Sequence, residues 1–292
     1  MFTAVLIAPP NTETLSHKIV ETTHAKLKGG DIKWLSTDEA CEFEIGRMPQ
    51  DGDACIWQAM QTEDIDIAIV PTQGRRKKVL LADMDSTMIE QECIDELADL
   101  AGHGTRVKEI TARAMNGEIE FEDALRARVG LFEGVDVDVI KKVIEERITF
   151  MPGGKILLST MKSSGAFTAL VSSGFTDFTA HVSAMLGFDE HRANVLLQED
   201  GKLTGKPGTP ILGQQAKVDA MDEITKNLAL ADDDVLAVGD GANDLPMITR
   251  AGLGVALHAK PNVQKHAKVK LNFADLTGLL YLQGYTKSEF TN

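Results

Sequence analysis

The sequence contains few cysteines and no long apolar run, and each absence excludes a class of protein. Its three cysteines, Cys41, Cys55 and Cys93, are spread over 292 residues and form no CxxC pair. A disulfide scaffold is therefore not expected, and a reducing, cytoplasmic setting is the simplest interpretation. No stretch reaches the roughly 18 consecutive apolar residues of a membrane-spanning helix, and the start of the chain has no basic leader. We expect neither a membrane span nor a signal peptide.

Basic residues are scarce relative to acidic ones, with 30 Lys and Arg against 44 Asp and Glu and a formal net charge of −14. Nucleic acids and anionic membranes bind basic surfaces, so neither is expected as a partner. The basic run at 74–78, GRRKK, is short and contains no aromatic residue, and it favours a solvated linker. An anionic small molecule would need cations placed locally in its site.

The first 74 residues predict a small α+β domain. Strands are expected at 2–8, 32–35, 41–45 and 65–70, and helices at 15–27 and 54–60, the first of them capped by Asn11 or Thr12. The order βαββαβ is that of a ferredoxin-like sandwich, so we place a domain boundary after residue 74. No ligand motif is visible here. Structural support, contact in a homodimer and binding of an amino acid remain open as its role.

The remaining residues, 75–292, predict a larger α/β domain. A buried strand at 79–82 is followed by a helical segment within 89–150, with helices expected at 89–101, 107–116, 121–131 and 137–147. Alternation then resumes, with strands at 167–171, 235–238, 253–256 and 269–271 and a hairpin over 195–198 and 202–204. The pattern predicts a doubly wound parallel sheet, with a helical cap inserted after its first strand.

Polar residues follow these strands at their carboxyl ends, where open α/β sheets bind ligands. Asp83 and Asp85 end the first strand in the stretch VLLADMDSTM, and alternation should point both carboxylates into one small volume. Two such groups favour a cation between them, or a proton on one of them. Further candidates in chain order are Ser172, Ser173, Gly174, Lys217, Asp240, Asn243 and Asp244. Each is weak alone, because an SSG is usually a turn and a lone helical lysine is usually solvated, but their joint placement indicates one site.

The order DxDST, strand-end serine, lysine and GDGxND resembles the haloacid dehalogenase superfamily of phosphatases over about residues 79–282. Glu92, Phe121 and Arg128 further resemble the phosphoserine phosphatase family, which hydrolyses O-phospho-L-serine to L-serine and phosphate in the last step of serine biosynthesis. The phosphate loop reads SSGF where the family often has SGGF, so Ser173 replaces a glycine. Longer members carry ACT-like domains where this chain has residues 1–74.

The resemblance implies a role for each matched acidic residue. Asp83 would be the nucleophile that forms an aspartyl-phosphate, and Asp85 the general acid and base. The ligands of Mg²⁺ would be the Asp83 carboxylate, the Asp85 backbone carbonyl and the Asp240 carboxylate. Asp244 would hold a coordinated water or orient Lys217.

The resemblance also implies how phosphoserine is bound. Phosphate-binding groups would be Ser172, Ser173, Gly174, Lys217 and Asn243. Glu92 would bind the ammonium group and Arg128 the carboxylate of the substrate. Two alternatives remain: a phosphatase or phosphotransferase of the same superfamily that acts on another small phosphomonoester, and an amino-acid-sensing regulatory protein with a nearly inert catalytic body.

Overall fold

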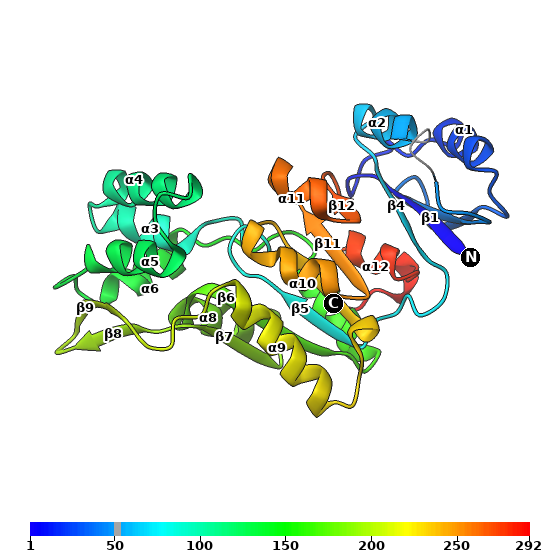
Figure 1. Cartoon of the computed structure of the whole chain (residues 1–292). Helices are drawn as coiled ribbons and strands as arrows, with labels where there is room; N and C mark the ends of the chain where they lie inside the picture. Colours follow the sequence, from blue (N-terminus) through cyan, green and yellow to red (C-terminus); the bar gives the residue numbers. More distant parts are fainter. Residues whose placement is uncertain (50–53) are drawn as a thin grey trace.

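The computed structural model describes residues 1–49 and 54–292, and the side chains of Ala54 and Cys55 lie outside the described part. Two larger sheets and a group of cap helices follow one another along the molecule (Figure 1). Of the cysteines whose side chains are described, Cys41 and Cys93 are buried free thiols. No helix among the described residues is long and apolar enough to cross a bilayer.

The N-terminal sheet has the βαββαβ order that the sequence predicts. Its strands are β1 (Phe2–Ile7), β2 (Lys33–Ser36), β3 (Ala40–Ile45) and β4 (Asp66–Pro71), and its helices are α1 (His17–Leu27) and α2 (Ala54–Thr62). The strands pair antiparallel in the order β2-β3-β1-β4. One expected detail is wrong: Ser16 caps α1, because its Oγ accepts from the Ile19 N–H, whereas Thr12 donates to Pro9 in the preceding turn.

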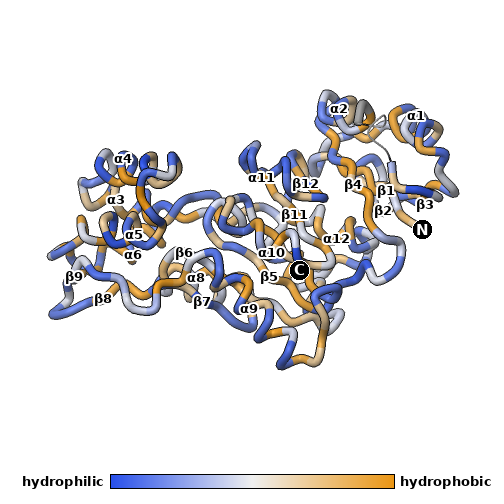
Figure 2. Tube along the Cα trace, viewed as in Figure 1, coloured by the Kyte–Doolittle hydropathy of each residue, from blue (hydrophilic) through white to orange (hydrophobic). Residues whose placement is uncertain are grey.

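Both faces of this sheet are buried. Strand alternation directs Ala4 and Leu6 of β1 toward the sheet's own helices, and Val5 and Ile7 toward the core of the larger body. Figure 2 shows β4 as one of the more hydrophobic segments of the chain. The Asp66 carboxylate adds a polar link, since it accepts N–H groups from residues 272, 273 and 274 at 2.8, 3.0 and 2.9 Å. The N-terminal sheet is thus firmly attached to the rest of the chain.

The central sheet is parallel throughout, in the order β12-β11-β10-β5-β6-β7. Its strands are β5 (Val79–Ala82), β6 (Phe167–Phe175), β7 (Glu190–Asn194), β10 (Val235–Gly239), β11 (Leu253–Leu257) and β12 (Val269–Leu271). Its helices are α7 (Gly154–Ser163), α8 (Thr176–Leu186), α9 (Gln214–Asn227), α10 (Leu245–Arg250), α11 (Pro261–His266) and α12 (Gly278–Leu282). Strand β7 and helices α10 and α11 were not expected from the sequence.

Helices cover both faces of this sheet, as a doubly wound fold requires. Residues 79 and 81 of β5 pack against α9, α10 and α11, while residues 80 and 82 pack in the core with α7, α8 and α12. All four residues of β5 are buried, which explains its continuous apolar run. The predicted fold class is confirmed.

The four cap helices are α3 (Cys93–Leu100), α4 (Gly104–Met115), α5 (Phe121–Gly130) and α6 (Asp138–Glu146). The first begins at Cys93 rather than at Ile89, because Ile89 pairs with Phe150 in an antiparallel bridge between the two connections to the cap. The hairpin of β8 (Leu196–Glu199) and β9 (Lys202–Pro207) lies beside these helices and away from the central sheet (Figure 1). Hydrogen bonds of 2.8 Å join Leu203 to residues 134 and 135, so the hairpin belongs to the cap.

The basic run at 74–78 is only partly the solvated linker that the sequence favours. Arg75 donates from Nε and Nη2 to the carbonyls of Leu282 and Tyr281, and its Nη1 lies 2.7 Å from a carboxylate oxygen of Glu42. Its side chain is 11% exposed, whereas that of Lys78 is 61% exposed. Through Arg75 the segment therefore connects Glu42 of the N-terminal sheet to α12, and it is not fully solvated.

Candidate active site

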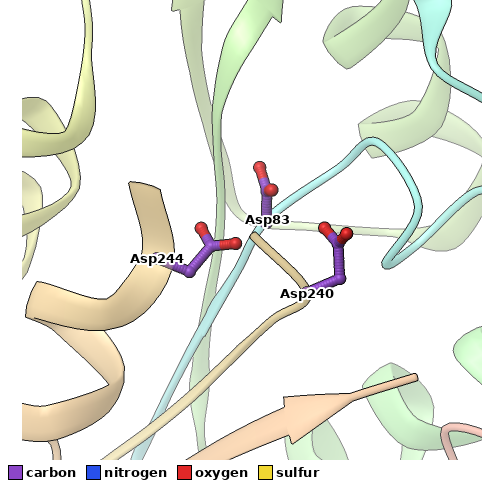
Figure 3. Close-up of side chains that lie close together, drawn as sticks. All are labelled: Asp83, Asp240 and Asp244. Carbon is purple, nitrogen blue, oxygen red and sulfur yellow. The ribbon is translucent and has the colours of Figure 1, made fainter. Parts of the chain in front are cut away.

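Three carboxylates meet at the carboxyl ends of β5 and β10, which are neighbours in the central sheet. Asp83 follows β5, and Asp240 and Asp244 follow β10 (Figure 3). All three side chains are buried, and each offers an oxygen within 4.8 Å of the others. Residues far apart in the sequence are thus brought together by strand pairing.

Lys217 lies among these acids and is 1% exposed, unlike the solvated lysine that is usual on a helix. Its Nζ is 2.6 Å from Asp83 Oδ1 and 2.5 Å from Asp244 Oδ1. Burial alone would lower the pKa of Lys217, but the charges of Asp244 and Asp83 outweigh it and raise that pKa. The lysine is therefore held charged beside the first carboxylate of the DxD.

Lys217 is a buried ammonium group among three buried carboxylates and does not neutralise them all, so the cluster favours further positive charge. Burial and the neighbouring Asp244 raise the pKa of Asp83 well above its usual range, although Lys217 opposes them. Burial and Asp244 likewise raise the pKa of Asp240 to about 7. A divalent cation would relieve this repulsion, and an oxygen-only donor set suits a hard ion.

The two oxygens of Asp244 already have protein partners. Oδ1 pairs with Lys217, and Oδ2 accepts from the backbone N–H of Gly241 at 2.9 Å. Asp83 and Asp240 are therefore the better placed of the three to ligate an ion, while Asp244 orients the lysine and the turn at 240–244.

Asp85 lies two residues beyond Asp83 and is less buried. Burial and the nearby charge of Glu92 raise the pKa of Asp85 to about 7, opposed by the Cys93 N–H, which donates to Oδ1 at 3.3 Å. A carboxyl group with a pKa near neutrality can both give and accept a proton, as a general acid and base must.

The strand-end serines and glycine form a tight loop beside Asp85. The Gly174 N–H donates to Ser172 Oγ at 2.8 Å, and Asn243 Nδ2 lies 3.5 Å from Ser173 Oγ. A Cβ at Gly174 would lie 3.0 Å from Asp85 Oδ2 and 3.1 Å from Ser172 Oγ, so a larger residue here would crowd both groups. The backbone of Ser173 does not adopt a positive φ, so serine fits at this position without strain.

A pocket with about 320 Å³ of empty volume, partly open to solvent, lies between the cap and this loop. It is lined by Asp85, Glu92, Ile94, Phe121, Leu125, Arg128, Ser173, Gly174 and Phe175. The structure thereby brings the two cap residues singled out in the sequence, Glu92 and Arg128, to the same pocket as Asp85.

Among the described residues, Arg128 and Glu92 have few strong protein partners. Arg128 donates from Nε to the Ala124 carbonyl at 3.3 Å and from Nη1 to Thr111 Oγ1 at 3.4 Å, both long bonds. Glu92 accepts one bond of 2.9 Å from Ser86 Oγ. Burial lowers the pKa of Arg128, opposed by Asp95 and Glu92. The guanidinium thus keeps donors that a ligand carboxylate can use.

Sequence reasoning missed one cation near the acids. Lys260 Nζ lies 3.9 Å from Asp240 Oδ2, and the Lys260 N–H donates to the Asp240 carbonyl at 3.4 Å. Its charge opposes the rise in the pKa of Asp240. The sequence signal that could have identified Lys260 is its position shortly after β11, because ligands bind beyond the carboxyl ends of the strands in such a sheet.

Comparisons with known proteins agree with this geometry. A family model described as haloacid dehalogenase-like hydrolase matches residues 80–249. The chain is 45% identical over 241 residues to a probable phosphoserine phosphatase of Schizosaccharomyces pombe, which covers 81% of this chain and 80% of that protein.

Two solved structures are similar as well. The unliganded crystal structure of a probable phosphoserine phosphatase from Vibrio cholerae matches with a TM-score of 0.80 and 30% identity, over 99% of this chain and 88% of that one. A phospho-aspartyl intermediate analogue of a phosphoserine phosphatase matches with a TM-score of 0.66 and 38% identity, over 70% of this chain and 98% of that one. The chain therefore belongs to the haloacid dehalogenase-like hydrolases and, within them, to the phosphoserine phosphatase family.

Proposed function

We propose that this chain is a Mg²⁺-dependent phosphatase that hydrolyses O-phospho-L-serine to L-serine and phosphate. The proposal rests on one arrangement of charged groups. Asp83, which pairs with the buried Lys217, lies near a pocket whose lining includes Glu92 and Arg128 of the cap. Asp83 with Lys217 suits phosphoryl transfer, whereas Glu92 with Arg128 suits the ammonium and carboxylate groups of an amino acid.

In the first half-reaction Asp83 attacks phosphorus. Lys217 holds Oδ1, so we assign the attack to Oδ2. A bond forms between that oxygen and phosphorus while the bond from phosphorus to the serine oxygen breaks. Asp85 donates a proton to the departing oxygen, which yields L-serine and an aspartyl-phosphate.

In the second half-reaction Asp85 takes a proton from a water molecule. The water oxygen forms a bond to phosphorus and the bond to Asp83 breaks, which releases phosphate and restores both carboxyl groups. Lys217, the Ser172 hydroxyl, Asn243 and the backbone amides at Ser173 and Gly174 bind the phosphoryl oxygens in both steps.

The assigned Mg²⁺ ligands are the Asp83 carboxylate, the Asp85 backbone carbonyl and the Asp240 carboxylate, with Asp244 behind them. When bound, the ion supplies positive charge that lets an anionic nucleophile approach an anionic phosphate. The raised pKa values of Asp83 and Asp240 support this assignment, since both reflect repulsion that a cation relieves.

Substrate selection is assigned to the cap. Arg128 binds the carboxylate of phosphoserine through its planar fork of donors, and Glu92 binds the ammonium group. The assigned metabolic role is the last step of serine biosynthesis. We place it in the cytoplasm, in keeping with the free thiols of Cys41 and Cys93, and assign catalysis and the cap to residues 75–292.

Phosphate release from a panel of phosphorylated metabolites, with and without EDTA, tests the proposal. We expect phosphoserine to be turned over far faster than sugar phosphates or pyridoxal phosphate, and EDTA to abolish turnover. Equal turnover across the panel would favour another phosphomonoesterase. Binding of an amino acid without metal-dependent turnover would favour a sensor. That alternative is the weaker one, because the chain keeps all four acids, Asp83, Asp85, Asp240 and Asp244.

A further inference from the structure

The side chain of Asn194 lies at the end of β7 and is 2% exposed. Its Nδ2 donates to the carbonyls of Ser173 at 2.8 Å and Leu212 at 3.1 Å, and its Oδ1 accepts the Leu212 N–H at 2.7 Å. The partners fix the orientation of the amide, because two carbonyls require its NH₂ group and one N–H requires its oxygen. All three bonds go to backbone segments next to site residues.

The first of these segments is an arch in β6. Val171 pairs with Arg192 and Phe175 pairs with Asn194, so residues 172–174 of β6 lie opposite a single residue of β7. Such a bulge leaves backbone groups without ladder partners and redirects them, and a buried carbonyl needs another donor. Asn194 supplies that donor for the Ser173 carbonyl.

The same bond sets the direction of an amide donor. The Ser173 carbonyl and the Gly174 N–H belong to one planar trans peptide group, in which they point in opposite directions. With the carbonyl held by Asn194, the N–H points to Ser172 Oγ, on the side where Gly174 approaches Asp85. The Gly174 N–H thereby holds the Ser172 hydroxyl, a group that we assign to the phosphate.

The second segment leads into the helix that carries Lys217. Leu212 precedes Gly213, the N-terminal capping residue of α9, and is bound by Asn194 through both its N–H and its carbonyl. One buried side chain thus joins the phosphate loop to the start of the helix from which the lysine reaches Asp83.

We propose that Asn194 is a positioning residue for phosphoryl transfer. It fixes the Gly174 N–H and, through that N–H, the Ser172 hydroxyl that we assign to the phosphate, and it holds the phosphate loop next to the start of α9. This inference rests on the proposed function, because it concerns the same site. It assigns Asn194 to the phosphate half of the pocket alone, since no bond joins it to Glu92 or Arg128 among the described residues.

The test compares Asn194→Ala with Asn227→Ala, a control at the exposed end of α9. The Kd of inorganic phosphate and of L-serine is measured by calorimetry with Mg²⁺ present, and kcat is measured with phosphoserine. For Asn194→Ala we expect kcat to fall by about 100-fold, as for loss of one preorganised donor. We expect the phosphate Kd to rise by about tenfold and the L-serine Kd to change by less than about twofold. The control should match the unmodified protein.

A parallel rise in the Kd of phosphate and of L-serine would overturn the inference, because it would indicate that the whole site is less ordered. An unchanged Kd of phosphate would overturn it as well. Should Asn194→Ala not fold, Asn194→Asp decides by the same ratio of dissociation constants, because it keeps the volume and the acceptor for Leu212. Unmodified protein that fails to hydrolyse phosphoserine would overturn the proposed function separately, since phosphate binding is measured without turnover.

Discussion

Arg128→Ala should impair the use of phosphoserine without impairing phosphoryl transfer itself. The residue projects from α5 into the pocket, and its two protein bonds are 3.3 and 3.4 Å long, so its removal should cost the fold only about 1 kcal/mol or less. A charge-assisted bond to a ligand carboxylate contributes about 1.5–3 kcal/mol. We therefore expect kcat/KM for phosphoserine to fall by roughly 10- to 150-fold.

The assay compares phosphoserine with an aryl phosphate, which has no carboxylate for the guanidinium to bind. Arg126→Ala is the matched control, because Arg126 lies on the same helix with a 47% exposed side chain that pairs only loosely, at 3.6 Å, with Glu122. Arg128→Lys should recover part of the loss, since it keeps the charge but not the planar fork. Equal losses on both substrates, or no loss on phosphoserine, would refute the assignment of Arg128 to the substrate carboxylate.

Three further predictions concern other parts of the molecule. Asp66→Ala should lower the free energy of unfolding by about 2–4 kcal/mol, measured by urea denaturation against Glu63→Ala, because the N–H groups of 272–274 lose their acceptor. Gly174→Ala should reduce kcat more than thermal stability, because a methyl group there crowds Asp85; unchanged kcat would argue against a tight loop during catalysis. Mg²⁺ at about 100 times its Kd should stabilise the chain by about 2.7 kcal/mol, and EDTA should reverse the rise in Tm; an unaltered Tm would contradict a metal site at the acids.

Much of the fold could be predicted because strands that are buried on both faces have apolar sequences. The four residues of β5 are apolar since both faces of a central strand are covered, and site residues follow such strands at their carboxyl ends. Strand β7 was missed because it lies at the sheet edge and reads EHRAN, with charged side chains that edges tolerate.

Other features depend on contacts between distant residues, which local patterns do not encode. The hairpin β8–β9 was expected, but nothing in its sequence shows that β9 packs on α5. The burial of Lys217 between two acids was likewise invisible, since an isolated helical lysine is usually exposed. Its joint placement with the other polar clusters made it a candidate, and the family resemblance suggested its role, but its pairing with Asp83 and Asp244 is seen only in the structure.

The central claim is that Asp83 becomes transiently phosphorylated. Acid quenching of the protein during turnover of ³²P-labelled phosphoserine, followed by peptide mapping, tests it most directly. We expect label on the peptide that contains Asp83 in the unmodified protein, and none in Asp83→Asn. Label on a different residue, or continued turnover with no labelled peptide, would contradict the account.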